Sequence, residues 1–427
     1  MKVLIVGGGG REHAIALKIK ENPEVTALYA APGNGGIAQI ATCLPFKATD
    51  VDGIVRWAAE NKVDFVIVAP DDPLCLGMVD ALAEQGIPAF GPRKNAAIIE
   101  GSKVFSKNLM KKYGIPTAAY ETFDDYDEAV KYLQTADMPI VVKADGLALG
   151  KGVLICPDRD SAVEAVASMM KEAKFGASGA RVVIEEFLTG PEVSVLAFTD
   201  GKTVKPMVSS MDHKRALDHD EGLNTGGMGT IAPNPCYTPE LARRCMDEIF
   251  LPTIAAMNAE GRTFTGCLYF GLMMTPKGPK VIEYNCRFGD PETQVVLPLL
   301  KSDLLTIMRA TVDGTLADTS VEFASGAACC VVLASGGYPV SYKSGYPISG
   351  LDEAGKTATV FHAGTKLIDG QIVTAGGRVL GVTATANTLE AAIDKAYQAA
   401  DKITFTDMHM RRDIGQRALA SRKESHS

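Results

Sequence analysis

The sequence predicts a multidomain protein of the α/β and α+β classes, with an N-terminal doubly wound parallel sheet, a larger central domain and a small β-rich C-terminal domain. The chain has 427 residues, and at about 150 residues per domain this length suggests roughly three domains. Short apolar stretches alternate with helix-period segments at the start of the chain, whereas closely spaced apolar stretches return after residue 325. Apolar residues make up 46% of the chain, so each domain can bury a core.

The first domain is predicted from this alternation. Apolar stretches lie at residues 3–6, 27–31, 65–69 and 88–90, and segments such as 12–20 and 77–85 have the apolar spacing of helices. This order is typical of a parallel sheet covered by helices on both faces.

Four glycines, residues 7–10, fall where the first strand turns into the first helix, a place where backbone N–H groups can receive a phosphate. Glu12 stands where a dinucleotide-binding turn has its third glycine, and no ribose-binding acid follows the second strand. A small phosphorylated substrate therefore fits better than NAD. Glycines that only permit a tight turn are an equal alternative.

The composition changes near residue 102. A lysine-rich helix is predicted from Lys103, and Gly114 and Pro116 are signals for its end. Apolar strands at 328–334, 357–362 and 378–385, followed by a helix at 389–403, indicate a third domain. We therefore expect domains at residues 1–102, 103–325 and 326–427.

Charge, hydropathy and cysteine spacing disfavour several classes of protein. A net charge of −8 disfavours nucleic acid as a partner, and the scattered cations near the end of the chain, Arg411 among them, are expected to form a solvated surface segment. The longest apolar runs reach only eight residues, so no membrane partner is expected. The first residues resemble no export signal, which favours a cytoplasmic location. The nine cysteines include no Cys-x-x-Cys pair, so neither a disulfide framework nor a structural zinc site is expected.

Residues 141–155 are the strongest candidate for a phosphate loop. Two apolar stretches flank a turn that contains Gly146, Gly150 and Gly152 together with Lys143 and Lys151. Such a hairpin can lay backbone N–H groups and two cations around a polyphosphate. It is not a Walker loop, because its glycine spacing is one residue short and no Ser or Thr follows Lys151. A generic hairpin is the alternative, but a lysine inside an apolar strand is costly without a partner, which favours a role for Lys143.

Residues 281–292 are predicted to form a strand with one chemically active face. Alternation places Glu283, Asn285 and Arg287 on one face, and the side chains of residues 282, 284 and 286 on the other. The first two suit a magnesium ion that bridges ATP phosphates, and the Arg287 fork suits a carboxylate or phosphoryl group. A solvent-facing strand with an ion pair is the alternative. Asp290 and Glu292 disfavour it because they crowd further charge at the same strand end.

Two more segments lie between these. An apolar strand at 182–187 ends in Glu185, Glu186, Phe187 and Leu188, and Glu192 follows a Gly-Pro turn. This edge can offer backbone groups to adenine and a carboxylate to ribose, although surface glutamates are the default. Residues 212–215 and 224–229 form a polar, glycine-rich stretch that indicates a substrate loop, in which His213 is expected to make hydrogen bonds rather than transfer protons.

Taken in order, these motifs resemble the ATP-grasp enzymes and, more narrowly, the phosphoribosylamine-glycine ligase family. The similar segments are residues 9–13, 31–34, 100–103, 143–152, 212–215, 224–229, 285–293 and 362–365. The most specific are Asp-His-Lys-Arg at 212–215 and Asn-Cys-Arg-Phe-Gly-Asp-Pro-Glu-Thr at 285–293. The resemblance implies a central ATP-grasp fold with a mobile lid subdomain at about residues 118–190. It also implies the ATP-dependent ligation of glycine to 5-phosphoribosylamine through a glycyl phosphate, in purine biosynthesis.

The resemblance further implies roles for individual residues. ATP would be bound by Lys103, Lys143, Gly146, Gly150, Lys151, Gly152, Glu185, Glu186, Phe187, Leu188 and Glu192. Magnesium or manganese would be held by Glu283 and Asn285. Glycine and phosphoribosylamine would be surrounded by Gly9, Gly10, Asp212, Lys214, Asn224, Thr225, Gly226, Gly227, Arg287 and Glu292. The expected catalytic residues are Arg287, Lys143 and Asp212.

The sequence departs from the family pattern at two places, and two other classes of function remain as alternatives. Asp71 stands where a glutamate is common, and residues 269–273 contain no acidic metal ligand, which leaves the number of metal ions open. A nicotinamide oxidoreductase would rest on the first domain alone. A non-catalytic nucleotide-binding regulator would not need the face with Glu283, Asn285 and Arg287. We expect small-molecule partners and a monomer or weak homo-oligomer.

Overall fold

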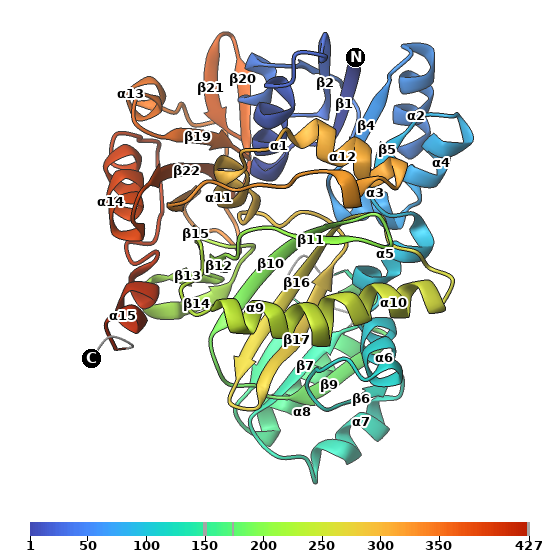
Figure 1. The fold of residues 1–427 in the computed structure, drawn as a ribbon. Coiled ribbons are helices and arrows are strands. Elements are labelled where there is room, and N and C mark those ends of the chain that lie inside the picture. Colours follow the sequence, from blue (N-terminus) through green and yellow to red (C-terminus); the bar gives the residue numbers. More distant parts are fainter. Residues whose placement is uncertain (148–151, 173–174, 425–427) are drawn as a thin grey trace.

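The N-terminal sheet is parallel and doubly wound, as predicted. A computed structural model describes residues 1–147, 152–172 and 175–424 of the chain, and this sheet lies at the top of Figure 1, in blue. Its strand order is β3-β2-β1-β4-β5. The strands are β1 (Lys2–Gly7), β2 (Ala27–Pro32), β3 (Thr42–Cys43), β4 (Phe65–Val68) and β5 (Ala89–Phe90). The helices are α1 (Gly10–Lys20), η1 (Ile37–Gln39), α2 (Val51–Glu60), α3 (Asp71–Cys75), α4 (Met78–Glu84) and α5 (Lys94–Gly101).

A lysine-rich helix leads out of this sheet. Helix α6 (Lys103–Tyr113) begins after Ser102, whose hydroxyl accepts a hydrogen bond from the backbone N–H of Phe105. It ends at Gly114, which adopts the left-handed conformation with φ of 68°. The predicted stop signal is therefore confirmed, because glycine reaches this conformation without a steric penalty.

The next segment folds around a small core of its own. An antiparallel sheet in the order β6-β9-β7-β8 is covered by two helices and occupies the bottom of Figure 1. Its elements are β6 (Tyr120–Phe123), α7 (Tyr126–Leu133), β7 (Ile140–Ala144), β8 (Val153–Cys156), α8 (Arg159–Met170), η2 (Gly176–Gly179) and β9 (Val182–Glu186). Strands β7 and β8 pair antiparallel, so the predicted glycine-rich loop does connect strand to strand. Gly150 and Lys151 of that loop lie outside the described residues.

A second antiparallel sheet forms the centre of the molecule, with strand order β11-β10-β16-β17 and helices packed on one face (Figure 1). Its elements are β10 (Glu192–Thr199), β11 (Val204–Pro206), α9 (Pro239–Cys245), η4 (Met246–Phe250), α10 (Leu251–Ala259), β16 (Gly266–Thr275) and β17 (Gly278–Asn285).

Strand β17 departs from the simple alternation expected from the sequence. Gly271 pairs with Glu283 but Leu272 pairs with Val281, so Ile282 is an extra residue in a β-bulge. Val281 and Tyr284 are buried, whereas Ile282 is partly exposed. The prediction that Ile282 shares the buried face of Tyr284 and Cys286 is therefore wrong, because the bulge reverses the alternation at that point.

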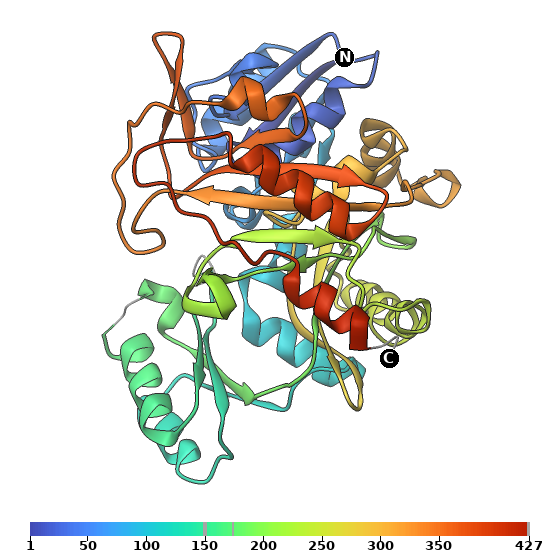
Figure 2. The same ribbon diagram turned by 90° about the vertical axis from the view of Figure 1, so that its left-hand side faces the viewer.

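The C-terminal part contributes a third antiparallel sheet, in the order β12-β15-β18-β22-β19. The remaining elements of the described chain are β12 (Met211–Asp212), β13 (Arg215–Leu217), η3 (Asp218–Asp220), β14 (Glu221–Asn224), β15 (Gly229–Ala232), α11 (Thr293–Val296), η5 (Leu297–Leu299), α12 (Leu304–Asp313), η6 (Leu316–Asp318), β18 (Ala327–Ala334), α13 (Leu351–Gly355), β19 (Thr359–His362), β20 (Thr365–Ile368), β21 (Gln371–Thr374), β22 (Arg378–Ala386), α14 (Leu389–Ala400) and α15 (Gln416–Glu424). Strands β13 and β14 form a separate two-stranded sheet, as do β20 and β21, and α12 packs against α1 and β5 of the N-terminal part. Helix α14 covers one face of the third antiparallel sheet (Figure 2). Because β12 and β15 precede residue 325, the domain limits stay a prediction.

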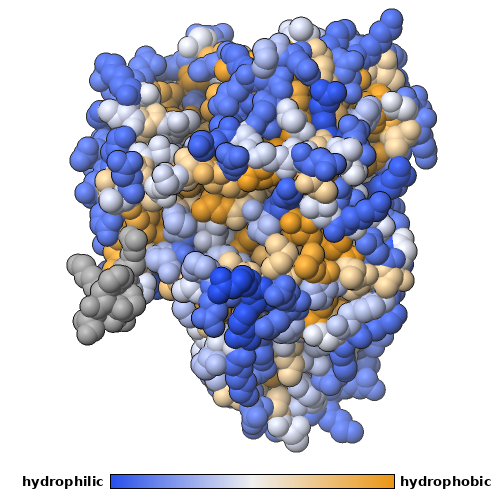
Figure 3. Space-filling model, in the orientation of Figure 1, coloured by the Kyte–Doolittle hydropathy of each residue, from blue (hydrophilic) through white to orange (hydrophobic). Residues whose placement is uncertain are grey.

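The surface of the protein is mostly polar, but one cation that the sequence places on it is buried. The face in Figure 3 is mostly hydrophilic, with apolar patches between charged side chains. Within residues 1–147, 152–172 and 175–424, no helix has the length and apolar character needed to cross a bilayer. One expectation about the surface is wrong: Arg411 is only 1% exposed and is paired with acidic side chains, so the C-terminal cations do not all face solvent.

Candidate active site

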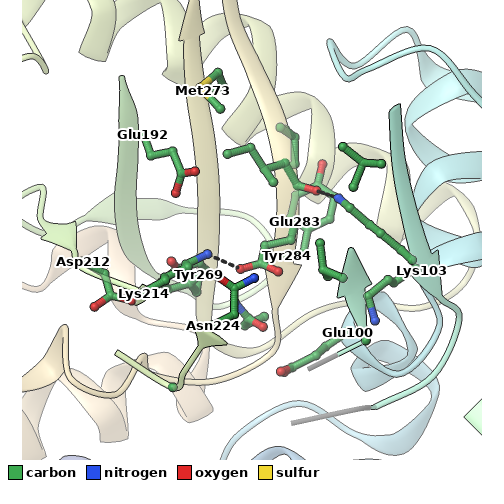
Figure 4. Close-up of a pocket in the computed structure, with 18 of the residues that line it drawn as sticks. Glu100, Lys103, Glu192, Asp212, Lys214, Asn224, Tyr269, Met273, Glu283 and Tyr284 are labelled. Carbon is green, nitrogen blue, oxygen red and sulfur yellow. Dashed lines mark hydrogen bonds and ion pairs between the residues drawn. The ribbon is translucent and has the colours of Figure 1, made fainter. Parts of the chain in front are cut away.

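A cleft of about 740 Å³ lies where the small sheet, the central sheet and the C-terminal segments meet (Figure 4). Most of the residues selected from the sequence line it, although they come from distant parts of the chain. They are Lys103, Lys143, Gly152, Glu185, Glu186, Phe187, Leu188, Glu192, Asp212, Lys214, Asn224, Thr225, Gly226, Glu283, Asn285, Arg287 and Glu292. The phosphate loop and the active strand face predicted separately therefore belong to one site.

Four of the predicted glycines do not contribute to the described wall of this cleft: Gly9, Gly10, Gly146 and Gly227. The N-terminus of α1 is satisfied by the protein's own carboxylates, since Gly9 N donates to Glu12 Oε2 at 2.7 Å and Arg11 N donates to Asp290 Oδ2 at 3.3 Å. From this turn, Arg11 rather than the glycines reaches the cleft.

Gly227 belongs to the substrate loop and packs against Asp212. Its φ is 122°, and a Cβ there would lie 2.6 Å from Asp212 Oδ1. Glycine at this position therefore lets the loop pack against the Asp212 carboxylate.

Lys143 has the partner that its place in an apolar strand requires. It forms an ion pair with Glu185 on the neighbouring strand β9, and Lys107 Nζ lies 2.7 Å from the other carboxylate oxygen of Glu185. All three side chains are nearly buried. Burial lowers the pKa of Lys107 to about 8, although Glu185 opposes this shift. The Glu185 carboxylate thus holds two cations beside the cleft, and the sequence interpretation missed Lys107, four residues after Lys103 on the same helix.

Strand β17 carries two oxygen atoms that could bind a metal ion in the cleft, one from Glu283 and one from Asn285. Glu283 Oε1 lies 3.4 Å from Lys214 Nζ, drawn as a dashed line in Figure 4, and Asn285 Oδ1 accepts a hydrogen bond of 3.4 Å from Arg287. Lys214 lowers the pKa of Glu283 to about 2, further aided by Lys143 and Lys103. Glu283 is therefore ionised at neutral pH, as a metal ligand must be.

Arg287 is fixed by an acid from the first hundred residues. Its NH2 group lies 2.8 Å from Glu100 Oε1, while Glu100 Oε2 accepts a hydrogen bond of 2.7 Å from the backbone N–H of Cys286. Although burial alone would lower the pKa of Arg287, Glu100 and Asp71 raise it, so the guanidinium stays charged. Arg287 Nε is buried and has no hydrogen-bond partner among the residues that the structure describes. A free charged donor in a cleft is suited to an anionic ligand.

Two acids in the cleft, Asp212 and Glu292, have pKa values above the ordinary range. Burial and the neighbouring Glu292 raise the pKa of Asp212 well above its ordinary value, and burial raises the pKa of Glu292 itself. Glu292 Oε1 accepts a hydrogen bond of 3.2 Å from Tyr269, whose hydroxyl also lies 2.8 Å from Ser194 Oγ. Acids of this kind occur where protons are exchanged near neutral pH.

The C-terminal part supplies residues that the sequence interpretation missed. Arg378 donates hydrogen bonds of 2.8 Å to Gly226 O and 2.9 Å to Asp290 O, so it ties the substrate loop to the 285–293 motif. The Tyr338 hydroxyl accepts a hydrogen bond of 3.1 Å from Gly226 N. Both line the cleft, but nothing in the local sequence around either residue connects it with Gly226, more than 100 residues away.

Comparison with known proteins accounts for this arrangement. Models of the phosphoribosylglycinamide synthetase N domain, ATP-grasp (A) domain and C domain match residues 1–100, 101–293 and 328–417. A phosphoribosylamine-glycine ligase of Halalkalibacterium halodurans is 49% identical over 425 residues, covering 100% of this chain and 99% of the relative. The chain belongs to the phosphoribosylglycinamide synthetase family.

Solved structures agree with this membership of the phosphoribosylglycinamide synthetase family. A phosphoribosylamine-glycine ligase from Thermotoga maritima superposes with a TM-score of 0.86 at 34% identity, covering 97% of this chain and 100% of that one. A biotin carboxylase domain from Hydrogenobacter thermophilus superposes with a TM-score of 0.73 at 18% identity, covering 96% of this chain and 91% of that one. The second likeness concerns the fold alone. The resemblance inferred from the sequence motifs is thus confirmed.

Proposed function

We propose that the chain ligates glycine to 5-phosphoribosylamine with the consumption of ATP, yielding glycinamide ribonucleotide, ADP and phosphate. The observation that carries this proposal is the convergence of Lys103, Lys143, Glu283 and Arg287 with the substrate loop in one cleft. Family membership supports the same reaction.

The chemistry requires activation of a poor acyl donor. A glycine carboxylate oxygen attacks the γ-phosphoryl group of ATP, the bond to the leaving ADP oxygen breaks, and a glycyl phosphate forms. The amine of phosphoribosylamine then attacks the carbonyl carbon, phosphate leaves, and the nitrogen loses one proton. Most of the catalytic demand is the neutralisation of charge on the transferring phosphoryl group, together with positioning.

Specific side chains are suited to each demand. Lys103, Lys143 and, in the undescribed part of the loop, Lys151 bind ATP phosphates, while residues 185–188 and Glu192 border the nucleoside. Arg287, whose Nε is unpaired within the described part of the chain, binds the carboxylate or the phosphoryl group. The ionised Asp212 carboxylate, which its raised pKa makes a stronger base, accepts the proton from the amine. Lys214, Asn224, Thr225, Gly226 and Glu292 surround the substrates.

The donor set also fits a magnesium or manganese ion. Glu283 is ionised, and both Glu283 and Asn285 point oxygens into a cleft that would hold ATP phosphates. Magnesium is commonly held by one or two protein oxygens together with substrate phosphates. Such an ion, when bound, supplies charge neutralisation at the phosphate oxygens.

The small sheet with its separate core is suited to act as a lid. Its buried residues form a cluster of their own, and Asp145 at its base accepts hydrogen bonds from Ser102 Oγ and Val104 N at the start of α6. A rigid unit attached at one end can close over ATP and exclude water from a hydrolysable intermediate. We further propose a lid at about residues 118–190, domains at 1–102, 103–325 and 326–427, a cytoplasmic location, and a monomer or weak homo-oligomer.

The experiment is an assay of ATP consumption over a panel of small acids and amines. We expect turnover with glycine and freshly generated phosphoribosylamine together, and little with either alone or with alanine or serine in place of glycine. Efficient turnover with a different acid or amine, and none with this pair, would reassign the chain to another ATP-grasp ligase.

A further inference from the structure

The sequence predicted that the C-terminal cations would be solvated, yet Arg411 is one of the most deeply buried side chains of the protein. Its Nε and NH2 groups each lie 2.8 Å from one carboxylate oxygen of Asp413. Its NH1 group lies 3.0 Å from Asp220 Oδ1 and 3.1 Å from Arg215 O. A guanidinium in this setting holds three points of the chain in a fixed geometry, because its donors form a rigid planar fork.

Asp220 and Arg215 belong to one hairpin, residues 213–224, which we call the substrate hairpin. It contains β13, η3 and β14, and Figure 1 places it beside α15. Lys214, Arg215, Asp220 and Asn224 line the cleft. The buried Arg411 therefore contacts two residues, Arg215 and Asp220, of a hairpin that lines the cleft.

Arg411 lies within a longer segment whose residues also contact the substrate hairpin. The segment of residues 409–417, which we call the C-terminal clamp, contacts the first part of the substrate hairpin, from His213 to Asp220. The contacts are His409 Nε2 with Ala216 O at 2.7 Å, Arg412 N with Asp218 Oδ1 at 2.7 Å, His219 N with Asp413 Oδ2 at 2.9 Å, Gly415 N with His213 Nε2 at 3.1 Å, and Arg417 NH1 with Asp220 Oδ2 at 2.8 Å. Most of these bonds satisfy backbone groups, which a loop on its own would leave to water.

The substrate hairpin needs such support. An isolated two-stranded hairpin is marginally stable in water, and the pairing of β13 with β14 is irregular between Arg215 and Leu217. His219 and Asp220 adopt positive φ values of 60° and 56°, which are unfavourable for residues other than glycine. Leu217 and Leu223 are 47% and 56% exposed, so burial of the hairpin's own apolar side chains contributes little.

We propose that the C-terminal clamp positions the substrate hairpin for the reaction and that Arg411 is the positioning residue. Arg411 touches no substrate; it acts through Asp220 and the Arg215 carbonyl, which set where Lys214 and Asn224 enter the cleft. The inference rests on the proposed function only in assigning the hairpin to glycine and phosphoribosylamine.

The test compares Arg411→Ala and Arg411→Lys with the matched control Arg412→Ala. Arg412 is the adjacent cation, but its side chain is exposed and paired with Asp401, the residue that follows helix α14, 2.6 Å away. Arg411→Lys keeps the charge and the buried stem and loses the fork, so it remains informative if Arg411→Ala does not fold. Two readouts are needed: amide hydrogen exchange of residues 215–224 and the separate KM values for phosphoribosylamine, glycine and ATP.

We expect faster exchange across the hairpin in both Arg411 variants, with KM for phosphoribosylamine or glycine raised on the order of tenfold, because small displacements of positioning groups are costly. The KM for ATP and all values for Arg412→Ala should stay within about twofold of the parent. Unchanged exchange and unchanged KM values in a folded Arg411 variant would overturn the clamp. Faster exchange with unchanged KM values would support the clamp but contradict the assignment of the hairpin to these substrates.

Discussion

Lys143 shows how far a single residue can be interpreted from sequence. An ammonium group inside an apolar strand requires either a partner or a ligand, and this argument selected Lys143 without any structure. Its partner Glu185 lies on a strand about 40 residues away, so the pairing follows only from the antiparallel register of β7 and β9. Lys107 escaped notice for a related reason, because its ion pair with Glu185 joins helix α6 to strand β9 and so depends on tertiary packing.

Replacing Lys143 with alanine should impair ATP use and leave the fold intact. Glu185 retains Lys107 as a counter-ion, so no buried carboxylate is left unpaired. We expect kcat/KM for ATP to fall on the order of 100-fold, because one cation facing the phosphates is lost. Steady-state kinetics with a circular dichroism check measures this, with the exposed Lys131→Ala as control. A folded variant with parental kinetics for ATP would remove Lys143 from the site.

Replacing Glu283 with glutamine should shift the magnesium dependence to higher concentration. The pKa of about 2 means that Glu283 is a full anion at neutral pH, and glutamine offers only a neutral oxygen. A magnesium titration of activity at saturating ATP measures the shift, and the surface variant Glu353→Gln is the control. Titration curves that superimpose on those of the parent would argue against a metal at this position.

Among the secondary-structure elements, the sequence patterns identified about half of the described strands and the helix stop at Gly114, because these depend on local apolar spacing and on glycine. The bulge in β17 could not be predicted in this way. It arises from the pairing of Gly271 and Leu272 with residues 283 and 281, a property of two strands rather than of one. Its consequence is local, since Glu283 and Asn285 still face the cleft as predicted.

A substitution in the core of the proposed lid should destabilise the lid without destabilising the rest of the chain. Met169 in α8 is fully buried in the separate core of the small sheet. We expect Met169→Ala to cost about 2–5 kcal/mol of local unfolding free energy, the range found for large-to-small changes in cores. Glu164→Ala on the exposed side of the same helix should cost less than about 0.5 kcal/mol.

Native-state amide exchange measures both lid variants. Faster exchange confined to about residues 120–186 fits a separate lid unit. Equal acceleration in β1 and β4 would show that the lid and the N-terminal sheet unfold as one unit.

At the scale of the whole molecule, buried histidines join parts of the chain that are far apart in sequence. His13 Nδ1 accepts a hydrogen bond of 2.8 Å from His362 N, and His213 links the substrate hairpin to Gly415. Burial lowers the pKa of His13 to about 3 and those of His213 and His362 to about 4. These junctions therefore require neutral imidazoles.

Acid should weaken these junctions. A depressed histidine pKa contributes stability that is present above the unfolded value of about 6.5 and is lost as the pH falls through the folded value. For His213 the loss amounts to roughly 3 kcal/mol between about pH 6.5 and pH 4. The melting temperature should fall over this range, and less steeply in His213→Gln. Parallel curves for the two proteins would contradict the role of this histidine.

The sequence motifs predicted the family and most of the cleft, because those residues lie in specific local patterns. Arg378 and Arg411 lie outside such patterns, and their roles come only from the way the C-terminal sheet packs against the substrate loop and hairpin.

If glycine is activated by phosphorylation in this cleft, the nucleotide product must be ADP, because the bond between the γ-phosphoryl group and the ADP oxygen breaks. Lys143, Glu283 and Arg287 line one cleft, and we propose that the γ-phosphoryl end of ATP binds there. Quantification of nucleotides after turnover with glycine and freshly generated phosphoribosylamine should give ADP and inorganic phosphate, each equal to the glycinamide ribonucleotide formed. AMP with pyrophosphate as the stoichiometric products would show that glycine is activated by adenylylation and not by phosphorylation.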